Sequence, residues 1–430
     1  MDKFVHGIGM MYIGPDLLAV LKNRNYRLLW TTATINNAAE MSEVLVSSWL
    51  VLHLTGSPFQ VAMVGVSRTV SMIGFSLFAG AIGDRFNRKN VLLFSHVISL
   101  VAALGVLLIL VFGDISPWHL FLAAGIRGTG RAFDNTNRRA LVFQIVGSKN
   151  IVQAISLEFV GMSIGRIIGP LLTGILLQID ESAIWATEIL IVGYIVALLS
   201  LVLLKVDVYG QFRDRANVFS SISEGFKFAI KSPSISATLY TTVAMNVLFQ
   251  YQIFIPVVAE EYLGIGAALM GLLASSDGMG KVTGAIIMGI FSGYIRRQGR
   301  IFWLGSMGVA VCLLGFALSP WFMTSFLLLF LMGAAHTGFA TMQSSILLIA
   351  SPAKLHGRMG GVQQIAVGAG QMGSIEIGAI ATVLTVPIAL VLNAIGGIAI
   401  LLLIAMFMPA LMKPIPYVTD DEDSSPIQHK

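Results

Sequence analysis

Charged side chains recur at helical intervals inside long apolar stretches of this chain. One such stripe consists of Asn36, Glu40, Glu43 and Ser47, whose spacings of four, three and four residues place them on one face of a helix. Two carboxyl groups within one helical turn disfavour joint ionisation, so one of them can take up and release a proton. Glu40 and Glu43 are therefore candidates for proton exchange.

Further charged residues lie in apolar stretches at the same spacing: Arg127, Arg131, Asp134 and Arg138; Glu158 and Arg166; and Asp277 and Lys281. A charge at the centre of a bilayer costs about 2.5–3.5 kcal/mol on insertion scales, so these groups must face one another or an aqueous cavity. Pairing of Glu40 and Glu43 with Arg127 and Arg131 across such a cavity is the alternative to proton exchange. Asp277 and Lys281, one turn apart, predict a local ion pair.

These polar groups divide into two sets by the chemistry they offer. The candidates for proton coupling are the acids Glu40, Glu43, Asp134 and Glu158. The candidates for lining a substrate cavity are Asn36, Arg68, Arg127, Arg131, Arg166, Asn246, Gln250, His336 and Gln343.

The composition indicates the environment of the helices that carry these charged residues. The chain has 430 residues, of which 56% are hydrophobic and 11% charged, with a mean hydropathy of +0.83. A soluble domain carries about 25% charged residues, so lipid must cover much of this chain, which excludes a soluble enzyme. The net charge of +5 does not indicate nucleic-acid binding, because the bases gather at the ends of apolar runs. With the single Cys312 and no metal-ligand spacing, we expect no disulfide, metal or other cofactor.

Runs of about 20 apolar residues predict helices that cross the membrane. We find twelve such runs: 28–53, 60–82, 91–112, 118–138, 151–178, 184–204, 235–258, 268–292, 301–319, 322–348, 359–384 and 388–410. They are too long and too continuously apolar for the alternating strands of a barrel. The prediction is an all-α membrane protein.

The loop charges predict the orientation of these helices. Loops after even-numbered runs hold lysines and arginines such as Arg85, Arg139 and Arg300, whereas the loops after odd-numbered runs hold acids only. Basic loops stay in the cytoplasm, so both termini are expected there. The predicted domains are a cytoplasmic segment 1–27, a six-helix bundle 28–204, a cytoplasmic linker 205–234, a second six-helix bundle 235–410 and an acidic, disordered tail 411–430. Within the linker, apolar residues three or four apart over 218–230 favour an amphipathic helix on the membrane surface, with a plain linker as the alternative.

The two halves carry related loops, which indicates parallel repeats. Residues 80–89 read GAIGDRFNRK and residues 289–298 read GIFSGYIRRQ, so Gly80 matches Gly289 and Arg88 matches Arg297. The first loop resembles the signature loop of the major facilitator superfamily, with Asn87 at a position where that family has glycine. Asn tolerates the left-handed backbone that we expect in this turn.

The resemblance implies a conformational latch that holds the cytoplasmic ends of the halves together. Asp84 would accept hydrogen bonds from a helix N-terminus or pair with a base such as Arg138. The alternative is an ordinary basic loop. The latch candidates are Gly80, Asp84, Arg85, Arg88, Lys89 and Arg138.

A glycine-rich face and several short segments extend the resemblance over residues 20–410. Gly161, Gly165, Gly169, Pro170 and Gly174 are similar to the superfamily's antiporter motif, although small residues four apart also make a face for tight helix packing. The segments 54–58, 254–264 and 357–358 resemble the enterobactin-exporter-like branch, which includes macrolide-efflux-like proteins. The fold implied is two six-helix bundles whose first, fourth, seventh and tenth spans line a central cavity.

The function that these features imply is secondary active export of a small amphiphilic molecule, siderophore- or drug-like, by alternating access in exchange for protons. The expected partners are that small molecule, protons and the lipid bilayer of the cell (inner) membrane, with the chain as a monomer and no nucleic acid. An importer, symporter or uniporter of a small nutrient is the alternative. A membrane-embedded enzyme or sensor is a more distant one, because no nucleophile elbow or phosphate-binding loop is present.

Overall fold

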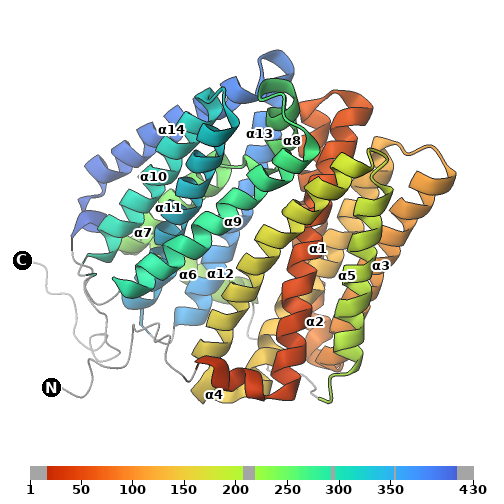
Figure 1. Cartoon of the computed structure of the whole chain (residues 1–430). Coiled ribbons are helices and arrows are strands. Elements are labelled where there is room, and N and C mark those ends of the chain that lie inside the picture. The colour runs from red at the N-terminus through yellow and green to blue at the C-terminus, as the bar shows by residue number, and fades with distance from the viewer. Residues whose placement is uncertain (1–16, 207–217, 292–294, 296, 353–354, 414–430) are drawn as a thin grey trace, which may run out of the picture.

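The computed structural model describes residues 17–206, 218–291, 295, 297–352 and 355–413, and within these ranges every regular element is helical. The first half begins with a short 3₁₀ helix, Leu17–Lys22. The helices that follow are α1 (Arg24–Thr55), α2 (Pro58–Arg85), α3 (Arg88–Phe112), α4 (Pro117–Ile179) and α5 (Ile184–Val202). Figure 1 shows them side by side as one bundle.

The element α4 contains two of the predicted apolar runs, 118–138 and 151–178. Its helical backbone is interrupted at Gly147, where φ is 72° and ψ is 172°. Glycine adopts this conformation without the steric penalty that a Cβ would bring. The break lets the chain enter a second helix after it.

The second half contains α6 (Val218–Lys231), α7 (Pro233–Leu248), a 3₁₀ turn Gln252–Phe254, α8 (Ile255–Val257), a π-helical turn Val258–Tyr262, α9 (Ala267–Ile290), α10 (Gln298–Leu318), α11 (Phe322–Ile349), α12 (His356–Gly368), α13 (Gly370–Val383), α14 (Val386–Phe407) and a 3₁₀ turn Pro409–Met412. The predicted run 235–258 is therefore not one regular helix. Pro256 has no N–H to donate to the carbonyl of Gln252, so a continuous α-helix is disfavoured there.

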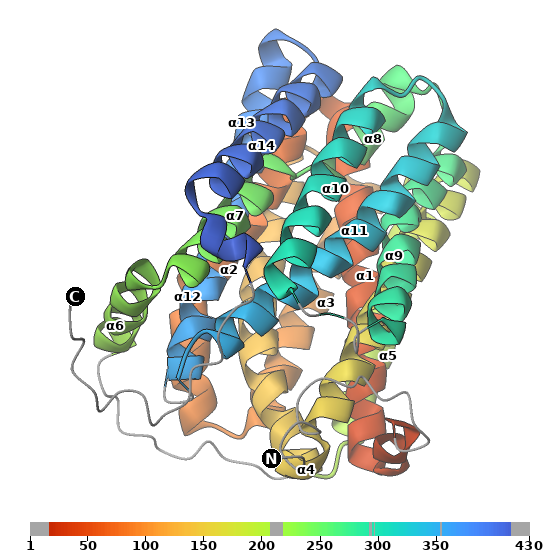
Figure 2. The ribbon, with the colours of Figure 1, turned by 90° about the vertical axis from the view of Figure 1, so that its left-hand side faces the viewer.

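The helices α6 and α7 lie where the sequence predicted a linker and the next span. In Figure 2, α6 projects from the lower part of the second half. Phe226 and Ile230 on α6 are exposed, while Ala229 is buried. Predicted apolar positions 219 and 222 belong to the part of α6 whose side chains the structure does not describe.

Seven segments of the described chain are long and apolar enough to cross a membrane: Arg88–Phe112, Gln153–Ile179, Ile184–Val202, Pro233–Tyr262, Gln298–Leu318, Phe322–Ile349 and Val386–Phe407. Large apolar side chains also cover the outside of the helices, including Val101, Leu108 and Phe112 of α3 and Leu402 and Phe407 of α14. A soluble monomer rarely exposes such a continuous apolar surface. The chain is therefore a multi-pass membrane protein.

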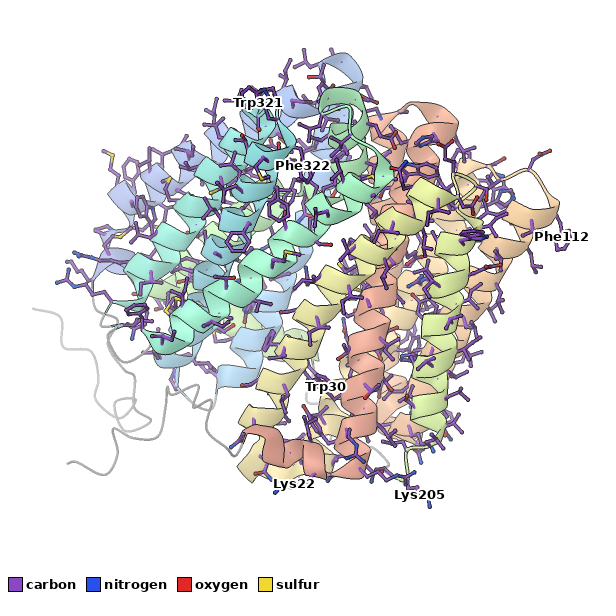
Figure 3. The ribbon with its side chains drawn as sticks, viewed as in Figure 1. Lys22, Trp30, Phe112, Lys205, Trp321 and Phe322 are labelled. Carbon is purple, nitrogen blue, oxygen red and sulfur yellow. The ribbon has the colours of Figure 1, made fainter. Side chains whose placement is uncertain are left out.

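The molecule has two chemically different ends. Figure 3 shows Lys22 and Lys205 at one end, which we call the basic end, and Phe112 and Trp321 toward the other, which we call the far end. The two halves pack together through α4 with α9 and through α2 with α13.

The close contacts between the halves gather toward the far end. A Cβ built on Gly174 of α4 would lie 2.6 Å from Cα of Gly271 on α9. Ser275 Oγ of α9 donates to the carbonyl of Ile167 on α4 at 2.8 Å. Near the end of α1, His53 Nε2 lies 3.6 Å from Glu260 Oε2 in the π-helical turn. In contrast, α12 packs against α6, α7 and α11 of its own half.

Candidate functional site

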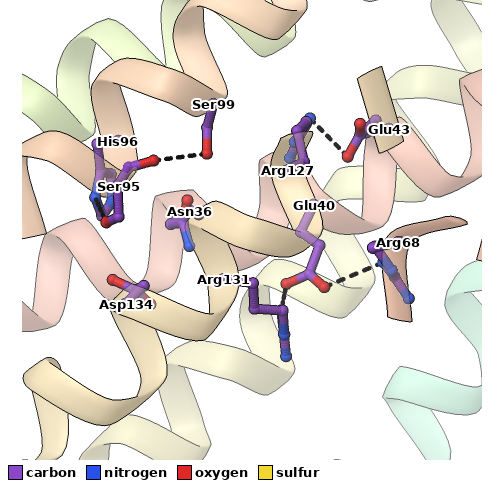
Figure 4. A pocket seen from close by; sticks show the side chains of 11 residues that line it. Asn36, Glu40, Glu43, Arg68, Ser95, His96, Ser99, Arg127, Arg131 and Asp134 are labelled. Atoms are coloured by element: carbon purple, nitrogen blue, oxygen red, sulfur yellow. Dashed lines mark hydrogen bonds and ion pairs between the residues drawn. The ribbon is translucent and has the colours of Figure 1, made fainter. Parts of the chain in front are cut away.

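The predicted stripe on α1 faces a polar pocket inside the first half, with about 360 Å³ of empty space. Helices α1, α2, α3 and α4 all contribute to it (Figure 4). The pocket is lined by Asn36, Glu40, Glu43, Arg68, Ser95, His96, Ser99, Arg127, Gly130, Arg131 and Asp134. The structure thus brings together seven of the predicted candidates, from helices that are distant in sequence.

Each α1 acid in this pocket is paired with at least one guanidinium. Glu40 accepts from Arg68 Nη1 at 3.2 Å and also pairs with Arg131. Glu43 Oε2 lies 2.6 Å from Arg127 Nη1, and the two side chains are only 12% and 6% exposed. Buried charges are tolerated when they are paired, so the arrangement accounts for five charges at membrane depth.

The remaining predicted acids of the first half lie closer to the basic end of α4. Asp134 forms an ion pair with Arg138, one turn along the same helix. Glu158, which does not line the pocket, interacts electrostatically with Arg138 and Arg139. Arg127 also lies over the ring of Tyr194 on α5, 4.5 Å from its centroid, which adds a cation–π contact.

Helix α3 contributes polar residues that we did not predict. Ser95, His96 and Ser99 are buried and line the pocket. The Nδ1 of His96 lies 3.0 Å from the carbonyl of Leu92 and 3.2 Å from Ser95 Oγ. The sequence held a signal, because these three are polar residues within one turn of an otherwise apolar run.

A second pocket, with about 450 Å³ of empty space, lies between the two halves. Its lining comes from α1 and α4 of the first half and from the 252–256 segment and α9 of the second: Met41, Val44, Leu45, Ser48, Arg166, Pro170, Gln252, Ile255, Pro256, Ala274, Asp277 and Gly278. Asp277 Oδ2 accepts from Lys281 Nζ at 2.6 Å, as the spacing predicted, and from Gln252 Nε2 at 3.1 Å. Arg166 is the predicted cavity residue found here.

Four other cavity candidates lie in the second half and line neither described pocket. Gln343 of α11 is buried and donates to Thr242 Oγ1 of α7 at 2.7 Å. Asn246 and Gln250 donate to carbonyls one turn earlier in their own segment. The ring of His336 lies 5.5 Å from that of Phe339. In this structure the contacts described for these four side chains are with residues of their own half. Their role in substrate contact stays a prediction.

The loop predicted as a latch has a different local structure from the one expected. Asn87 has φ −59° and accepts from Lys89 N at 2.9 Å as the N-cap of α3, so the expectation of a left-handed turn there is wrong. An Asn side chain that caps a helix satisfies one of the unpaired N–H groups of the first turn. Lys89 Nζ donates to the carbonyls of Val202 and Leu204 at 3.0 and 2.6 Å, and therefore caps the end of α5.

The other latch candidates lie at the same end of the first half. Arg85 is exposed at the last turn of α2, Arg88 is half-buried at the start of α3, and Arg138 pairs with Asp134. The surroundings of Gly80 and the side chain of Asp84 fall outside what the structure describes. At this end α2 approaches α4 closely at Gly83, where an added Cβ would meet the side chain of Asn137.

The glycine face predicted on 161–174 packs against both halves. A Cβ on Gly165 would lie 2.7 Å from the backbone nitrogen of Ala38 on α1, and one on Gly169 would meet the carbonyl of the same residue. Gly174, farther along α4, instead contacts α9 of the second half. These contacts give the glycines a packing role, which was one of the two interpretations of the motif.

Comparison with known proteins agrees with this architecture. The sequence pattern of the transmembrane secretion effectors of the major facilitator superfamily matches residues 16–429. The enterobactin exporter EntS of Salmonella typhi is 25% identical over 315 residues, which cover 72% of this chain and 74% of that protein. EntS of Shigella flexneri is 24% identical over 314 residues, covering 72% of this chain and 73% of that one.

Solved structures of transporters share the fold at low sequence identity. A bacterial homolog of the human lysosomal transporter Spinster, in an inward-facing and unoccupied conformation, superposes with a TM-score of 0.70 at 14% identity, covering 91% of this chain and 98% of that one. A POT family transporter in complex with 5-aminolevulinic acid gives a TM-score of 0.71 at 13% identity, covering 91% and 97%. With its helical fold, its buried charge network and a family match over nearly its whole length, this chain belongs to the transmembrane secretion effectors of the major facilitator superfamily and is a secondary transporter.

Proposed function

We propose that this transporter exports a small amphiphilic molecule, siderophore- or drug-like, by alternating access in exchange for protons. It would cross the cell (inner) membrane twelve times as a monomer, with both termini and the basic end in the cytoplasm. The far end would then face outward. The relatives of this chain include enterobactin exporters, which supports export as the direction of transport.

The observation that carries the proposal is the set of buried acids held by arginines from neighbouring helices. Glu40 is paired with Arg68 of α2 and Arg131 of α4, and Glu43 with Arg127 of α4. A proton on either carboxyl group would cancel its charge and loosen these pairs. Proton binding would thereby change the interactions of α1 with the helices on both sides of it.

The energy available from a proton is of the right size for this step. One charge that crosses the membrane releases about 2.3 kcal/mol per 100 mV. One pH unit adds about 1.4 kcal/mol. The sum is comparable to the roughly 3–5 kcal/mol lost when one partner of a buried pair is removed. One proton can therefore drive the loss of one such pair.

The contacts between the halves support an arrangement closed at the proposed outer end. Gly174 with Gly271, Ser275 with Ile167, and His53 with Glu260 all lie toward that end. In alternating access, substrate would load from the cytoplasm in this arrangement. Separation of these contacts would release it outside.

The test uses purified protein in sealed liposomes that contain a trapped pH-sensitive dye. Amphiphilic candidates are added one at a time, siderophores first. We expect proton movement that depends on substrate and runs opposite to substrate flux. Substrate flux without a proton signal would overturn proton exchange, and proton movement in the same direction as substrate would indicate symport instead.

A further inference from the structure

The pocket between the halves combines an apolar wall with one end that carries charge. Met41, Val44 and Leu45 of α1 form one side, and Ile255 and Pro256 face them from the second half. The charged end is formed by α4 and α9. The 450 Å³ of space not filled by atoms includes the opening of the pocket to solvent.

The charges at that end do not cancel. Asp277 is neutralised by Lys281 at 2.6 Å, and its Oδ2 also accepts from the Gln252 amide at 3.1 Å. Arg166, which is half-buried, interacts electrostatically with Asp277 and Lys281 but has no hydrogen bond or ion pair to any residue that the structure describes. With two bases and one acid, the cluster keeps one positive charge.

The first pocket provides a contrast inside the same molecule. There, Glu40 and Glu43 are each held by arginines, and Asp134 is paired with Arg138. In that network each base lies within ion-pair distance of an acid, a contact that Arg166 lacks among the described residues. Arg166 shares its pocket with the Asp277 carboxylate but forms no ion pair with it, and a guanidinium recognises planar oxygen anions through paired hydrogen bonds.

We propose that Arg166 binds an anionic oxygen group of the substrate, a carboxylate, phenolate or sulfonate, while an apolar ring of the same molecule packs between Leu45 and Pro256. This proposal rests on the proposed function, whose substrate class it narrows. A cationic substrate is disfavoured, because Asp277 is already engaged by two donors and the pocket carries a net positive charge.

The test is ligand binding to the purified protein in detergent, measured as a shift in thermal unfolding. Cys312 is the only cysteine, is half-buried in α10, and reports unfolding through its reaction with a fluorogenic maleimide. Three probes share one aromatic body: 2-naphthoate, the neutral 2-naphthamide and the cation 2-naphthylmethylammonium. A ligand that binds the folded state raises the melting temperature in proportion to its affinity.

We expect 2-naphthoate to stabilise the protein most and Arg166→Gln to abolish that preference. Loss of a charge-assisted contact is expected to weaken naphthoate binding by about ten- to a hundredfold. Arg24→Gln, at an exposed position at the start of α1, is the matched control and should bind like the wild type. Arg166→Gln breaks no ion pair of the described residues, and its melting temperature without ligand checks that it folds.

A second variant separates the two polar ends of the pocket. Asp277→Asn removes the acid that would bind a cation, and we expect naphthoate binding to persist or tighten. Naphthoate binding that is lost in Asp277→Asn, that is unchanged in Arg166→Gln, or that is no stronger than binding of the other two probes would overturn the proposal.

The outcome is independent of whether the protein exchanges protons. Preference for the anion in detergent, with no substrate-dependent proton movement in liposomes, would keep this site and remove the proposed coupling. Proton-coupled export of cations only would keep the coupling and remove this site.

Discussion

Gly174 of α4 and Gly271 of α9 place the backbones of the two halves in contact at the far end. A Cβ on Gly174 would lie 2.6 Å from Cα and 2.8 Å from N of Gly271. Carbon atoms in contact prefer about 3.5–4.0 Å. Because both obstructing atoms belong to the backbone, no side chain can rotate away. Gly174→Ala must therefore move the two helices apart by about 1 Å.

The size of the effect follows from the cost of overpacking. Extra atoms in a well-packed interface cost about 1–3 kcal/mol. This cost falls on the arrangement in which the halves touch and is absent when they separate. The ratio of separated to closed molecules should therefore rise by about 5- to 150-fold.

The assay measures access to the pocket between the halves from the proposed outer side. Ser48 lines this pocket and is 1% exposed, so Ser48→Cys reports its opening when Cys312 is replaced by serine. The rate of reaction with a membrane-impermeant maleimide, added from outside, should rise with Gly174→Ala. The control is Gly396→Ala, because an added Cβ at Gly396 meets no atom within 4 Å. Equal reaction rates in Gly174→Ala and the control would refute this account of closure.

Three further predictions concern contacts made by charged or titratable side chains. Glu43→Gln leaves the Arg127 charge buried without its partner and should destabilise the protein by about 3–5 kcal/mol. The double variant Glu43→Gln with Arg127→Gln should recover most of this loss of stability, measured by thermal unfolding. Equal stability of the single and double variants would contradict the pairing. The His53–Glu260 contact joins the halves at the far end, so His53→Gln should speed labelling of Ser48→Cys at a fixed pH; an unchanged rate would show that this contact does not hold the halves closed. Lys89→Met removes the cap of α5 and should lower the melting temperature without changing the labelling rate of Ser48→Cys. A changed labelling rate would instead support the predicted role of Lys89 in the latch.

The spacing of charges in the sequence predicted the faces of the first pocket and left the partners open. Glu40 and Glu43 share a face because of their three-residue interval. That Glu40 bonds Arg68 as well as Arg131 depends on how α2 and α4 lie against α1. Spacing within one helix carries no information on the neighbouring helix. The contribution of α3 was not predicted, because Ser95 and Ser99 are uncharged. An uncharged serine costs less inside a membrane than a charged residue, so it does not stand out in an apolar run.

Backbone features were harder to predict than side-chain faces. Asn87 occupies a position where the resemblance suggested a tight glycine turn, and its side chain instead caps α3. The predicted run 235–258 breaks between Leu248 and Ile255, directly before Pro256. A hydropathy pattern detects the length of an apolar run and is insensitive to such local changes in hydrogen bonding.

The glycine face of α4 links the proposed substrate site to the closure of the halves. Arg166 and Gly174 lie about two turns apart on this helix, and a Cβ on Gly278 of α9 would lie 3.3 Å from Cβ of Arg166. An anion on Arg166 therefore lies beside the same interface that Gly174 closes. A ligand shifts an equilibrium between two arrangements only by its difference in affinity for them, and the shift is reciprocal.

Gly174→Ala thus makes a second prediction, on binding. If the anion prefers the closed arrangement, this variant should weaken 2-naphthoate binding by up to the factor by which it increases maleimide labelling of Ser48→Cys. Gly396→Ala should change neither quantity. Unchanged naphthoate affinity together with faster labelling would mean that Arg166 binds anions equally in both arrangements. Binding there could then select the cargo but could not by itself move the halves, and the force for opening would have to come from the acids of the first pocket.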